Sequence, residues 1–156
     1  SLVALAAAAG WRSAADAAAP AGTFEITKTD EEWKKILTAE QFYVLRKHGT
    51  ERAGTSPLDK IYEPGLYHCA GCDQLLFSSE HKFDSKTGWP SFYQPISKTA
   101  FGTMEDRSWL GMLRVEYHCS RCGGHHGHVF EDGPKPTGLR YCNNGVALKF
   151  VPKPKA

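Results

Sequence analysis

The order of apolar and polar residues predicts two short helices near the start of the chain. In "TKTDEEWKKIL", Thr29 and Glu32 have the spacing of a capping box, and acidic residues fill the first turn, where the helix dipole favours them. "TAEQFYVLRKHG" repeats that spacing with Thr38 and Gln41 and ends in basic residues before Gly49. We therefore expect one helix after Thr29 and a second after Thr38, with a stop at Gly49.

From residue 65 onward the chain reads as short strands separated by turns. "LRVEYHC" is the clearest strand, because Leu113, Val115, Tyr117 and Cys119 alternate with the polar residues of the other face. Weaker candidates are "YHCAGC", "LLFSS", "KFDS", "SFYQPI", "HVFED" and "VALKFVP". The preceding stretch, residues 49–65, is dense in Gly, Pro, Ser and Asp and predicts a loop. The pattern predicts a mainly β fold, largely antiparallel, with the two helices in front.

The first 23 residues differ from the rest, because they begin with an apolar run and continue as an Ala-rich segment of small residues. Such a segment resembles the apolar part and cleavage zone of a secretory signal without its basic start, and the apolar run is too short to span a membrane. We treat residues 1–23 as a leader and residues 24–156 as a single domain. The compartment is cytoplasmic by default, and periplasmic or organellar if residues 1–23 are a targeting remnant.

The charged residues of the chain bear on which partners it could bind. Nineteen Lys and Arg against seventeen Asp and Glu give a net charge of +2, with both signs interspersed. That balance offers no basic stripe for nucleic acid and no acidic tail. We therefore expect no nucleic-acid partner and no membrane partner.

Four of the five cysteines form two C-x-x-C pairs, "CAGC" and "CSRC". Two such turns can supply the four thiolates of a tetrahedral zinc site, which leaves no open position for water and is therefore structural. The segment between the pairs is longer than the roughly 15–20 residues of a compact zinc ribbon, so the metal would join two distant parts of a sheet. The predicted ligands are Cys69, Cys72, Cys119 and Cys122.

The fifth cysteine, Cys142, has no partner nearby in the sequence. Arg140, Cys142 and Asn144 stand at alternate positions, so in a strand they share one face. A cation and an amide donor beside a thiol lower its pKa and make it reactive. On its own, a lone cysteine is more often a small buried hydrophobe, and an inert Cys142 stays an alternative.

Two further stretches carry candidate chemistry. "GGHHGHVFEDG" places His125, His126 and His128 in a Gly-bracketed segment directly after the second cysteine pair, and imidazoles near a thiolate can supply protons at neutral pH. The alternative is a solvated His-rich loop or an adventitious metal tract. "TGWPSFYQP" presents Trp89 at a Pro turn, where the indole could hold a small apolar group.

Together with "EEWKKILTAEQFYVLRKHGTE" and the terminal "ALKF", these stretches resemble the type-B methionine sulfoxide reductases over about residues 30–152. These enzymes act on the R epimer of methionine sulfoxide. The resemblance implies two antiparallel β-sheets with short helices packed outside and one structural zinc. It also implies that the enzyme repairs oxidised proteins by reducing the sulfoxide to the thioether of methionine. Its substrate would be methionine sulfoxide, free or in oxidised proteins.

The resemblance also implies a role for each candidate residue. Cys142 matches the nucleophile that attacks the sulfoxide sulfur and becomes a sulfenic acid. His125 and His128 match the histidines that orient the sulfoxide oxygen and deliver a proton. Arg140 and Asn144 match residues that polarise the site.

Trp89 matches the indole that holds the substrate methyl group.

The chain departs from the family at Thr87, where many members carry a recycling cysteine. We therefore expect an external thiol, thioredoxin or glutathione with glutaredoxin, to reduce the sulfenic acid directly. His126, Asn143 and Gly145 are further departures, at positions where leucine, an aliphatic residue and serine are usual.

Two alternatives belong to other classes of protein. One is a zinc-stabilised binding module in which Cys142 is inert, and the other is a secreted protein with disulfides. We also expect a monomer.

Overall fold

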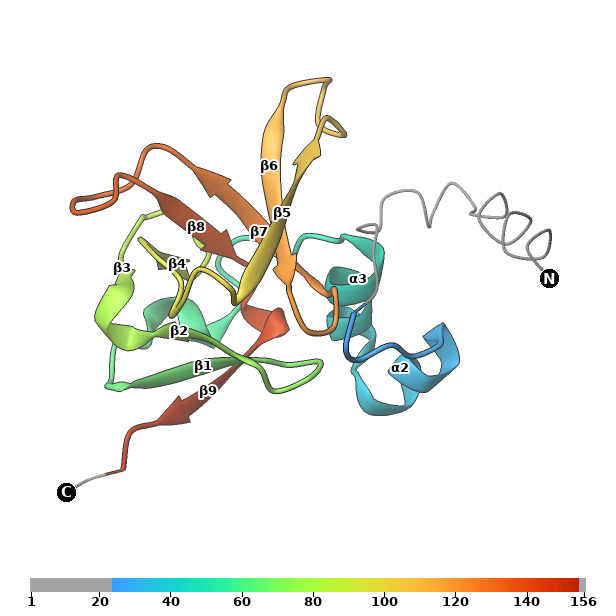
Figure 1. Cartoon of the computed structure of the whole chain (residues 1–156). Coiled ribbons are helices and arrows are strands. Elements are labelled where there is room, and N and C mark those ends of the chain that lie inside the picture. The colour runs from blue at the N-terminus through green and yellow to red at the C-terminus, as the bar shows by residue number, and fades with distance from the viewer. Residues whose placement is uncertain (1–23, 155–156) are drawn as a thin grey trace.

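The computed structural model describes residues 24–154, so the expected leader, residues 1–23, lies outside the described residues. Two helices stand beside one end of a pair of β-sheets (Figure 1). The helices are α2 (Asp30–Ile36) and α3 (Ala39–Lys47), with short 3-10 turns η2 (Pro57–Lys60), η3 (Ser79–His81) and η4 (Gly145–Ala147). The strands are β1 (Gly65–Cys69), β2 (Leu75–Ser78), β3 (Lys82–Phe83), β4 (Ser91–Phe92), β5 (Phe101–Asp106), β6 (Arg114–Cys119), β7 (His125–Phe130), β8 (Arg140–Asn143) and β9 (Leu148–Pro152).

Both predicted capping boxes are present. The Thr29 hydroxyl accepts a hydrogen bond from the Glu32 N–H, and the Glu32 carboxylate accepts one from the Thr29 N–H. Thr38 and Gln41 do the same at the start of α3. These reciprocal bonds satisfy backbone donors that a helix N-terminus otherwise leaves free.

The end of α3 differs in detail from the prediction. His48, and not Gly49, takes the left-handed conformation that ends the helix, with φ 58°. Gly49 makes room for the ring of Tyr43, which would have to move if a Cβ were present at position 49. The left-handed turn leaves the His48 imidazole beside the carboxylate of Glu116 on β6, with Nδ1 3.2 Å from Oε1.

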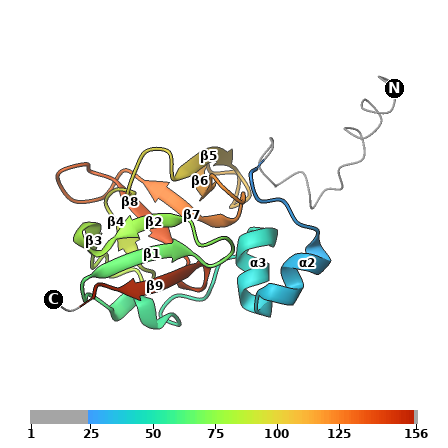
Figure 2. The ribbon, with the colours of Figure 1, turned by 60° about the horizontal axis from the view of Figure 1, so that its bottom comes forward.

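The strands form two antiparallel sheets, as the sequence predicts. The smaller sheet has the order β2-β1-β9, and the larger has the order β3-β4-β8-β7-β6-β5. Figure 2 shows the small sheet facing the β4 and β8 region of the large sheet, with both helices at one side. The predicted fold class is therefore confirmed.

Aromatic side chains fill the space between the sheets. The rings of Phe77 on β2 and Phe92 on β4 stack with centroids 4.0 Å apart, and Tyr67 on β1 meets Phe92 edge-on. Tyr117 on β6 is fully buried in the same core. Such rings bury large apolar areas, so this core fixes the strand that carries Cys142 against its neighbours.

The polar face of β6 is buried as well, which the alternation alone does not predict. Glu116 and His118 are both less than a tenth exposed, whereas Leu113 lies just before the strand and is 48% exposed. The C-terminus of α3 and the histidines of β7 cover this face, since His48 and His125 both approach Glu116. Among the described residues, no helix has the length and apolar character needed to cross a membrane.

Candidate active site and metal centre

Four cysteines converge where the two sheets meet. Cys69 ends β1 and Cys119 ends β6, and each C-x-x-C turn brings its second thiol back to the other pair. The Sγ atoms of Cys69 and Cys122 lie 3.8 Å apart, and those of Cys72 and Cys119 lie 3.5 Å apart. These separations are far longer than the roughly 2.05 Å of a disulfide bond, so the sequence alternative of disulfides is not what the structure shows.

The same geometry fits a tetrahedral metal ion. A metal–sulfur distance of about 2.3 Å places neighbouring sulfurs about 3.8 Å apart. All four sulfur atoms lie within 4.8 Å of one another. The Gly71 N–H and the Gln74 side-chain amide also donate to sulfurs of the cluster, which suits ligands that carry negative charge. The cluster could therefore hold a structural metal.

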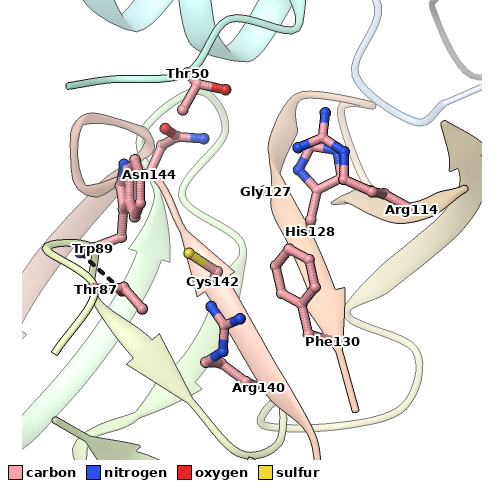
Figure 3. Close-up of a pocket in the computed structure, with 10 residues that line it drawn as sticks. All are labelled: Thr50, Thr87, Trp89, Arg114, Gly127, His128, Phe130, Arg140, Cys142 and Asn144. Atoms are coloured by element: carbon pink, nitrogen blue, oxygen red, sulfur yellow. Dashed lines mark hydrogen bonds between the residues drawn. The ribbon is translucent and has the colours of Figure 1, made fainter. Parts of the chain in front are cut away.

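A second site, a pocket of about 270 Å³, surrounds Cys142 (Figure 3). Its floor is formed by two paired strands, because Cys142 on β8 stands opposite His128 on β7 in the ladder. Side chains directly opposite in an antiparallel pair have Cβ atoms about 4.5–5.5 Å apart. The lining comprises Thr50, Thr87, Trp89, Arg114, Gly127, His128, Phe130, Arg140, Cys142 and Asn144.

Glycine at position 127 lets the two strands approach at this point. A Cβ on Gly127 would collide with the carbonyl oxygen of Cys142. His126 and His128 are thus the residues directly before and after the point where β7 comes close to the carbonyl oxygen of Cys142.

Burial dominates the electrostatics of Cys142. It raises the pKa of the thiol to about 11, although the Arg140 cation and hydrogen bonding to Thr87 and Arg140 act in the opposite direction. The prediction of a lowered pKa for Cys142 is therefore wrong. Burial cannot be read from residue spacing. Here it destabilises the thiolate more than the neighbouring cation and hydroxyl stabilise it.

The charge of Arg140 is shared with a second partner. Its Nε and Nη2 donate to the two carboxylate oxygens of Asp132 at 2.8 and 3.0 Å. This bidentate pair raises the pKa of Arg140, chiefly through the hydrogen bonds that Arg140 donates to Asp132, and holds the guanidinium against the Phe130 ring. Arg140 is thus fixed in place beside Cys142.

His128 is held by a carboxylate from the neighbouring hairpin. Its Nε2 lies 2.8 Å from Asp106 Oδ2, and Arg114 Nη2 donates to the same oxygen at 3.1 Å. Burial opposes ionisation of Asp106, yet hydrogen bonds from Ser108 and His128 hold the pKa of this carboxyl well below its usual range. Because Asp106 is ionised and can only accept, His128 donates through Nε2, and Nδ1 of the neutral ring is an acceptor.

His125 lies behind His128 and does not line the pocket. Its ring is 1% exposed, stands edge-on to the His128 ring, and approaches Glu116 with Nδ1 3.5 Å from Oε2. Burial, followed by the neighbouring histidines, lowers its pKa well below the usual value. The structure therefore brings only one of the two predicted histidines, His128, to the thiol.

One loop residue, Glu51, positions two predicted site residues. Its carbonyl oxygen accepts from Trp89 Nε1 at 3.0 Å, and its N–H donates to Asn144 Oδ1 at 2.8 Å. Its carboxylate accepts from the N–H groups of Gly145 and Val146. Trp89 and Asn144 thus both line the pocket, but Asn144 is fixed by the backbone around it and does not belong to β8.

Thr87 carries a hydroxyl at the position where the resemblance leads us to expect a recycling cysteine in many family members. Thr87 lines the pocket together with Cys142, and its Oγ1 lies 2.8 Å from Ser85 Oγ, which lies 2.7 Å from Ser91 Oγ. Ser91 pairs with Cys142 in the ladder between β4 and β8. Hydroxyl groups, and no second thiol, therefore surround the sulfur on this side among the described residues.

Sequence reasoning missed Asp106, Arg114 and Glu51. Asp106 and Arg114 stand opposite each other in the hairpin of β5 and β6, so a correct hairpin register would have found that pair. No comparable signal marks Glu51, which lies in a loop and acts mainly through its backbone.

Two β-sheets, a four-cysteine cluster that could hold a structural metal and a separate pocket around a fifth cysteine together suit the class of oxidoreductases. The SelR domain matches residues 37–152, and the chain belongs to this family. The predicted membership of the type-B methionine sulfoxide reductases, and with it the class of oxidoreductase, is confirmed.

Individual relatives agree with the family match. The chain is 54% identical over 127 residues to the peptide methionine sulfoxide reductase MsrB of Leptospira interrogans. The matched region covers 81% of this chain and 96% of that protein. It is 57% identical over 125 residues to the MsrB of Methanosarcina barkeri, which spans 80% of this chain and 87% of the relative. Among solved structures, the Mis18 "Yippee-like" domain matches 60% of this chain and all of that chain, with a TM-score of 0.49 and 18% identity.

Proposed function

We propose that this chain reduces the R epimer of methionine sulfoxide to methionine, with Cys142 as the nucleophile, and so repairs oxidised proteins. The observation that carries this proposal is the pairing of Cys142 with His128 across one pocket, because every other cysteine of the chain lies in the four-cysteine cluster. Trp89 and Phe130 line the same pocket and supply apolar surface for the substrate methyl group.

The first step is an oxygen transfer. Cys142 Sγ attacks the sulfoxide sulfur while the sulfoxide oxygen takes up a proton. The S–O bond of the sulfoxide then breaks, the oxygen forms a bond to Cys142 Sγ, and the thioether leaves. The substrate sulfur gains two electrons, Cys142 loses two, and the thiol proton ends on the sulfenic acid. Sulfoxide oxygen is a poor leaving group until it is protonated, so the step needs a proton beside the nucleophile.

The raised pKa of Cys142 supports the thiol itself as the source of that proton. With a pKa of about 11 the thiol is protonated at neutral pH, and the neutral ring of His128 can accept its proton and pass it to the sulfoxide oxygen. Asp106 holds the ring through Nε2 and stabilises the imidazolium that forms for a moment, as a carboxylate does in other nucleophile–histidine pairs. His125 acts from behind His128, as a residue that positions its ring.

The second half of the cycle uses outside thiols. One thiol attacks the sulfenic acid on Cys142 and releases water, and a second thiol resolves the mixed disulfide and restores Cys142. Thr87 and the serines beside it cannot form a disulfide with Cys142, which supports direct attack by thioredoxin, or by glutathione with glutaredoxin. We take the enzyme to be a monomer, and we keep the cytoplasm as its default compartment.

Zinc is the metal we assign to Cys69, Cys72, Cys119 and Cys122. Four thiolates at these separations suit a closed tetrahedral zinc site, which supplies cross-linking and takes no part in the reaction.

An apolar groove beside the pocket supports substrates that are part of a polypeptide. This groove, of about 570 Å³, shares Arg114 and Phe130 with the pocket, and its other lining residues include the exposed Trp109, Met112 and Leu113. Free methionine sulfoxide has no side chain to place there, whereas a peptide has the residue next to the oxidised methionine.

Met112→Ser should therefore lower kcat/KM for a peptide in which leucine follows the oxidised methionine, and it should leave kcat/KM for free methionine sulfoxide unchanged. Leu110→Ser, on the same turn but outside the groove, is the matched control.

Turnover of the separated R and S epimers of a protected methionine sulfoxide, with dithiothreitol as reductant, tests the proposal as a whole. We expect turnover of the R epimer alone and none from Cys142→Ser. Equal rates for both epimers, or an active Cys142→Ser variant, would refute the proposed function.

A further inference from the structure

Two fully buried polar side chains, His126 on β7 and Asn143 on β8, lie between the four-cysteine cluster and Cys142. Both are 0% exposed. His126 Nε2 lies 3.4 Å from Cys69 Sγ, and His126 Nδ1 lies 3.3 Å from Asn143 Nδ2. A single imidazole therefore contacts a predicted metal ligand at one end and the residue after Cys142 at the other.

The hydrogen bonds fix the direction of every donor in this chain of contacts. Asn143 Nδ2 donates to the carbonyl oxygen of Asn144 at 2.9 Å, and Asn143 Oδ1 accepts from the Tyr117 hydroxyl at 2.8 Å. A carbonyl can only accept, so the amide nitrogen must face Asn144 and offer its other hydrogen to His126 Nδ1. His126 is then the tautomer with its proton on Nε2, and it donates that proton toward Cys69 Sγ.

The backbone of His126 strengthens the same connection. Its carbonyl oxygen accepts from the Asn144 N–H and from Asn144 Nδ2, both at 2.9 Å. Ring and carbonyl of His126 thus hold both residues that follow Cys142. By contrast, both ring nitrogens of the nearby buried His125 have no hydrogen-bond partner within residues 24–154.

We infer that His126 and Asn143 act as one positioning pair that links the metal centre to the nucleophile. His126 orients and supports the Cys69 thiolate, as partners of metal ligands do, and Asn143 holds His126 while fixing the strand that carries Cys142. Neither residue touches the substrate. The inference rests on the proposed function, in which the cluster holds zinc and Cys142 reacts, and it assigns a shared purpose to two of the departures from the family pattern.

The metal end of the pair is tested with cobalt and zinc. In the cobalt-substituted protein, loss of the N–H···S bond should move the thiolate-to-cobalt charge-transfer band in His126→Leu. Zinc release to a chromophoric chelator should be about 10–100-fold faster in that variant. Asn143 does not contact the cluster. Asn143→Val should nevertheless shift the cobalt charge-transfer band and speed zinc release, because it removes the hydrogen bond that orients the His126 ring.

A double variant shows whether the pair is one unit. Asn143→Val should change the zinc release rate in the wild-type background and not in the His126→Leu background. The lost partner of the Tyr117 hydroxyl is common to both backgrounds and cancels in this comparison. His126→Gln, whose amide keeps an N–H for the sulfur, should restore part of the band position. His81→Leu, at a histidine outside both sites, is the matched control and should change nothing.

The nucleophile end is tested by the rate of Cys142 alkylation with iodoacetamide, followed by mass spectrometry. His126→Leu loosens a strand whose burial suppresses the thiolate, so alkylation should be about threefold faster or more. An unchanged cobalt band in Asn143→Val, additive effects in the double variant, or an unchanged alkylation rate in His126→Leu would each overturn the inference. None of these readouts needs sulfoxide turnover. If the variants change the cobalt band, zinc release and alkylation as expected while the wild type reduces no sulfoxide, the positioning pair is supported and only the proposed function is refuted.

Discussion

At the scale of single residues, Cys142 combines the reactive role that we propose for it with an environment that favours the protonated thiol. Burial raises its pKa to about 11, while Arg140 and Thr87 limit the rise. A resting thiol of this kind resists oxidation by solvent oxidants, because the thiolate is the species they attack. The site would therefore release its nucleophile only when a substrate accepts the proton.

The pH dependence of Cys142 alkylation follows from this pKa. Below pH 11 the thiolate fraction, and with it the iodoacetamide rate, should rise about tenfold per pH unit. Arg140→Met removes a cation that favours the thiolate, so it should slow alkylation at pH 8 by about tenfold. Mass spectrometry of the Cys142 peptide measures both rates. A wild-type rate that reaches its plateau near pH 8 would contradict the prediction.

Thr87 gives a second prediction at this scale. Its side chain lines the pocket together with Cys142 and acts to lower the pKa of that thiol, so Thr87→Cys should bring a second thiol within reach of the sulfenic acid. One turnover without reductant should then form an intramolecular disulfide in the variant and none in the wild type.

Thiol titration and peptide mapping after that single turnover measure the disulfide. Thr87→Ser is the control, since it keeps the hydroxyl and adds no thiol. An intramolecular disulfide in the wild type would show that a cluster cysteine recycles Cys142, and it would remove the argument for an external thiol.

At the scale of elements, the site depends on three neighbouring strands in correct register. Asp106 and Arg114 face each other across β5 and β6, and His128 on β7 reaches the same carboxylate. The hairpin of β5 and β6 thus acts as a support that holds the histidine toward β8. A carboxylate in this arrangement orients the imidazole and stabilises its charged form.

Asp106→Asn tests this support. The amide is nearly isosteric, but it cannot stabilise an imidazolium and can favour the wrong tautomer of His128. We expect kcat for the R epimer to fall by about 10²-fold or more, with KM changed much less. Steady-state kinetics measure the split between kcat and KM. Asp132→Asn is the matched control, because Asp132 holds Arg140 and not the histidine. An unchanged kcat in Asp106→Asn would remove His128 from the proton path.

The contrast between local and distant contacts explains what the sequence could predict. Helix caps and the C-x-x-C turns depend on residues three or four apart, so α2, α3 and the metal ligands were predictable. Asp106 and Glu51 reach the site from other parts of the chain, and their contacts depend on strand register and loop path. The burial of Cys142 likewise arises from packing, and for this reason its pKa was predicted in the wrong direction.

At the scale of the whole molecule, the four-cysteine cluster joins the two sheets. Cys69 belongs to the small sheet and Cys119 to the large one, so a metal held by both sets the position of each sheet against the other. The aromatic core performs the same task by packing, through Phe77 and Phe92. The pocket lies on the large sheet and shares no lining residue with the cluster. Metal loss should therefore act on stability first and on chemistry only through it.

Cys72→Ser separates these two effects. Removing one ligand weakens the cross-link between the sheets, and a loss of about 3–5 kcal/mol should lower the Tm by about 10 °C or more in a chain of this size. Metal analysis should find about one zinc per wild-type chain and much less in the variant. Cys142→Ser is the matched control and should keep both its zinc and its Tm. Below the melting transition, folded Cys72→Ser should still reduce the R epimer, since no step passes through the metal. A variant that keeps the wild-type Tm after losing its zinc would show that packing alone holds the sheets together.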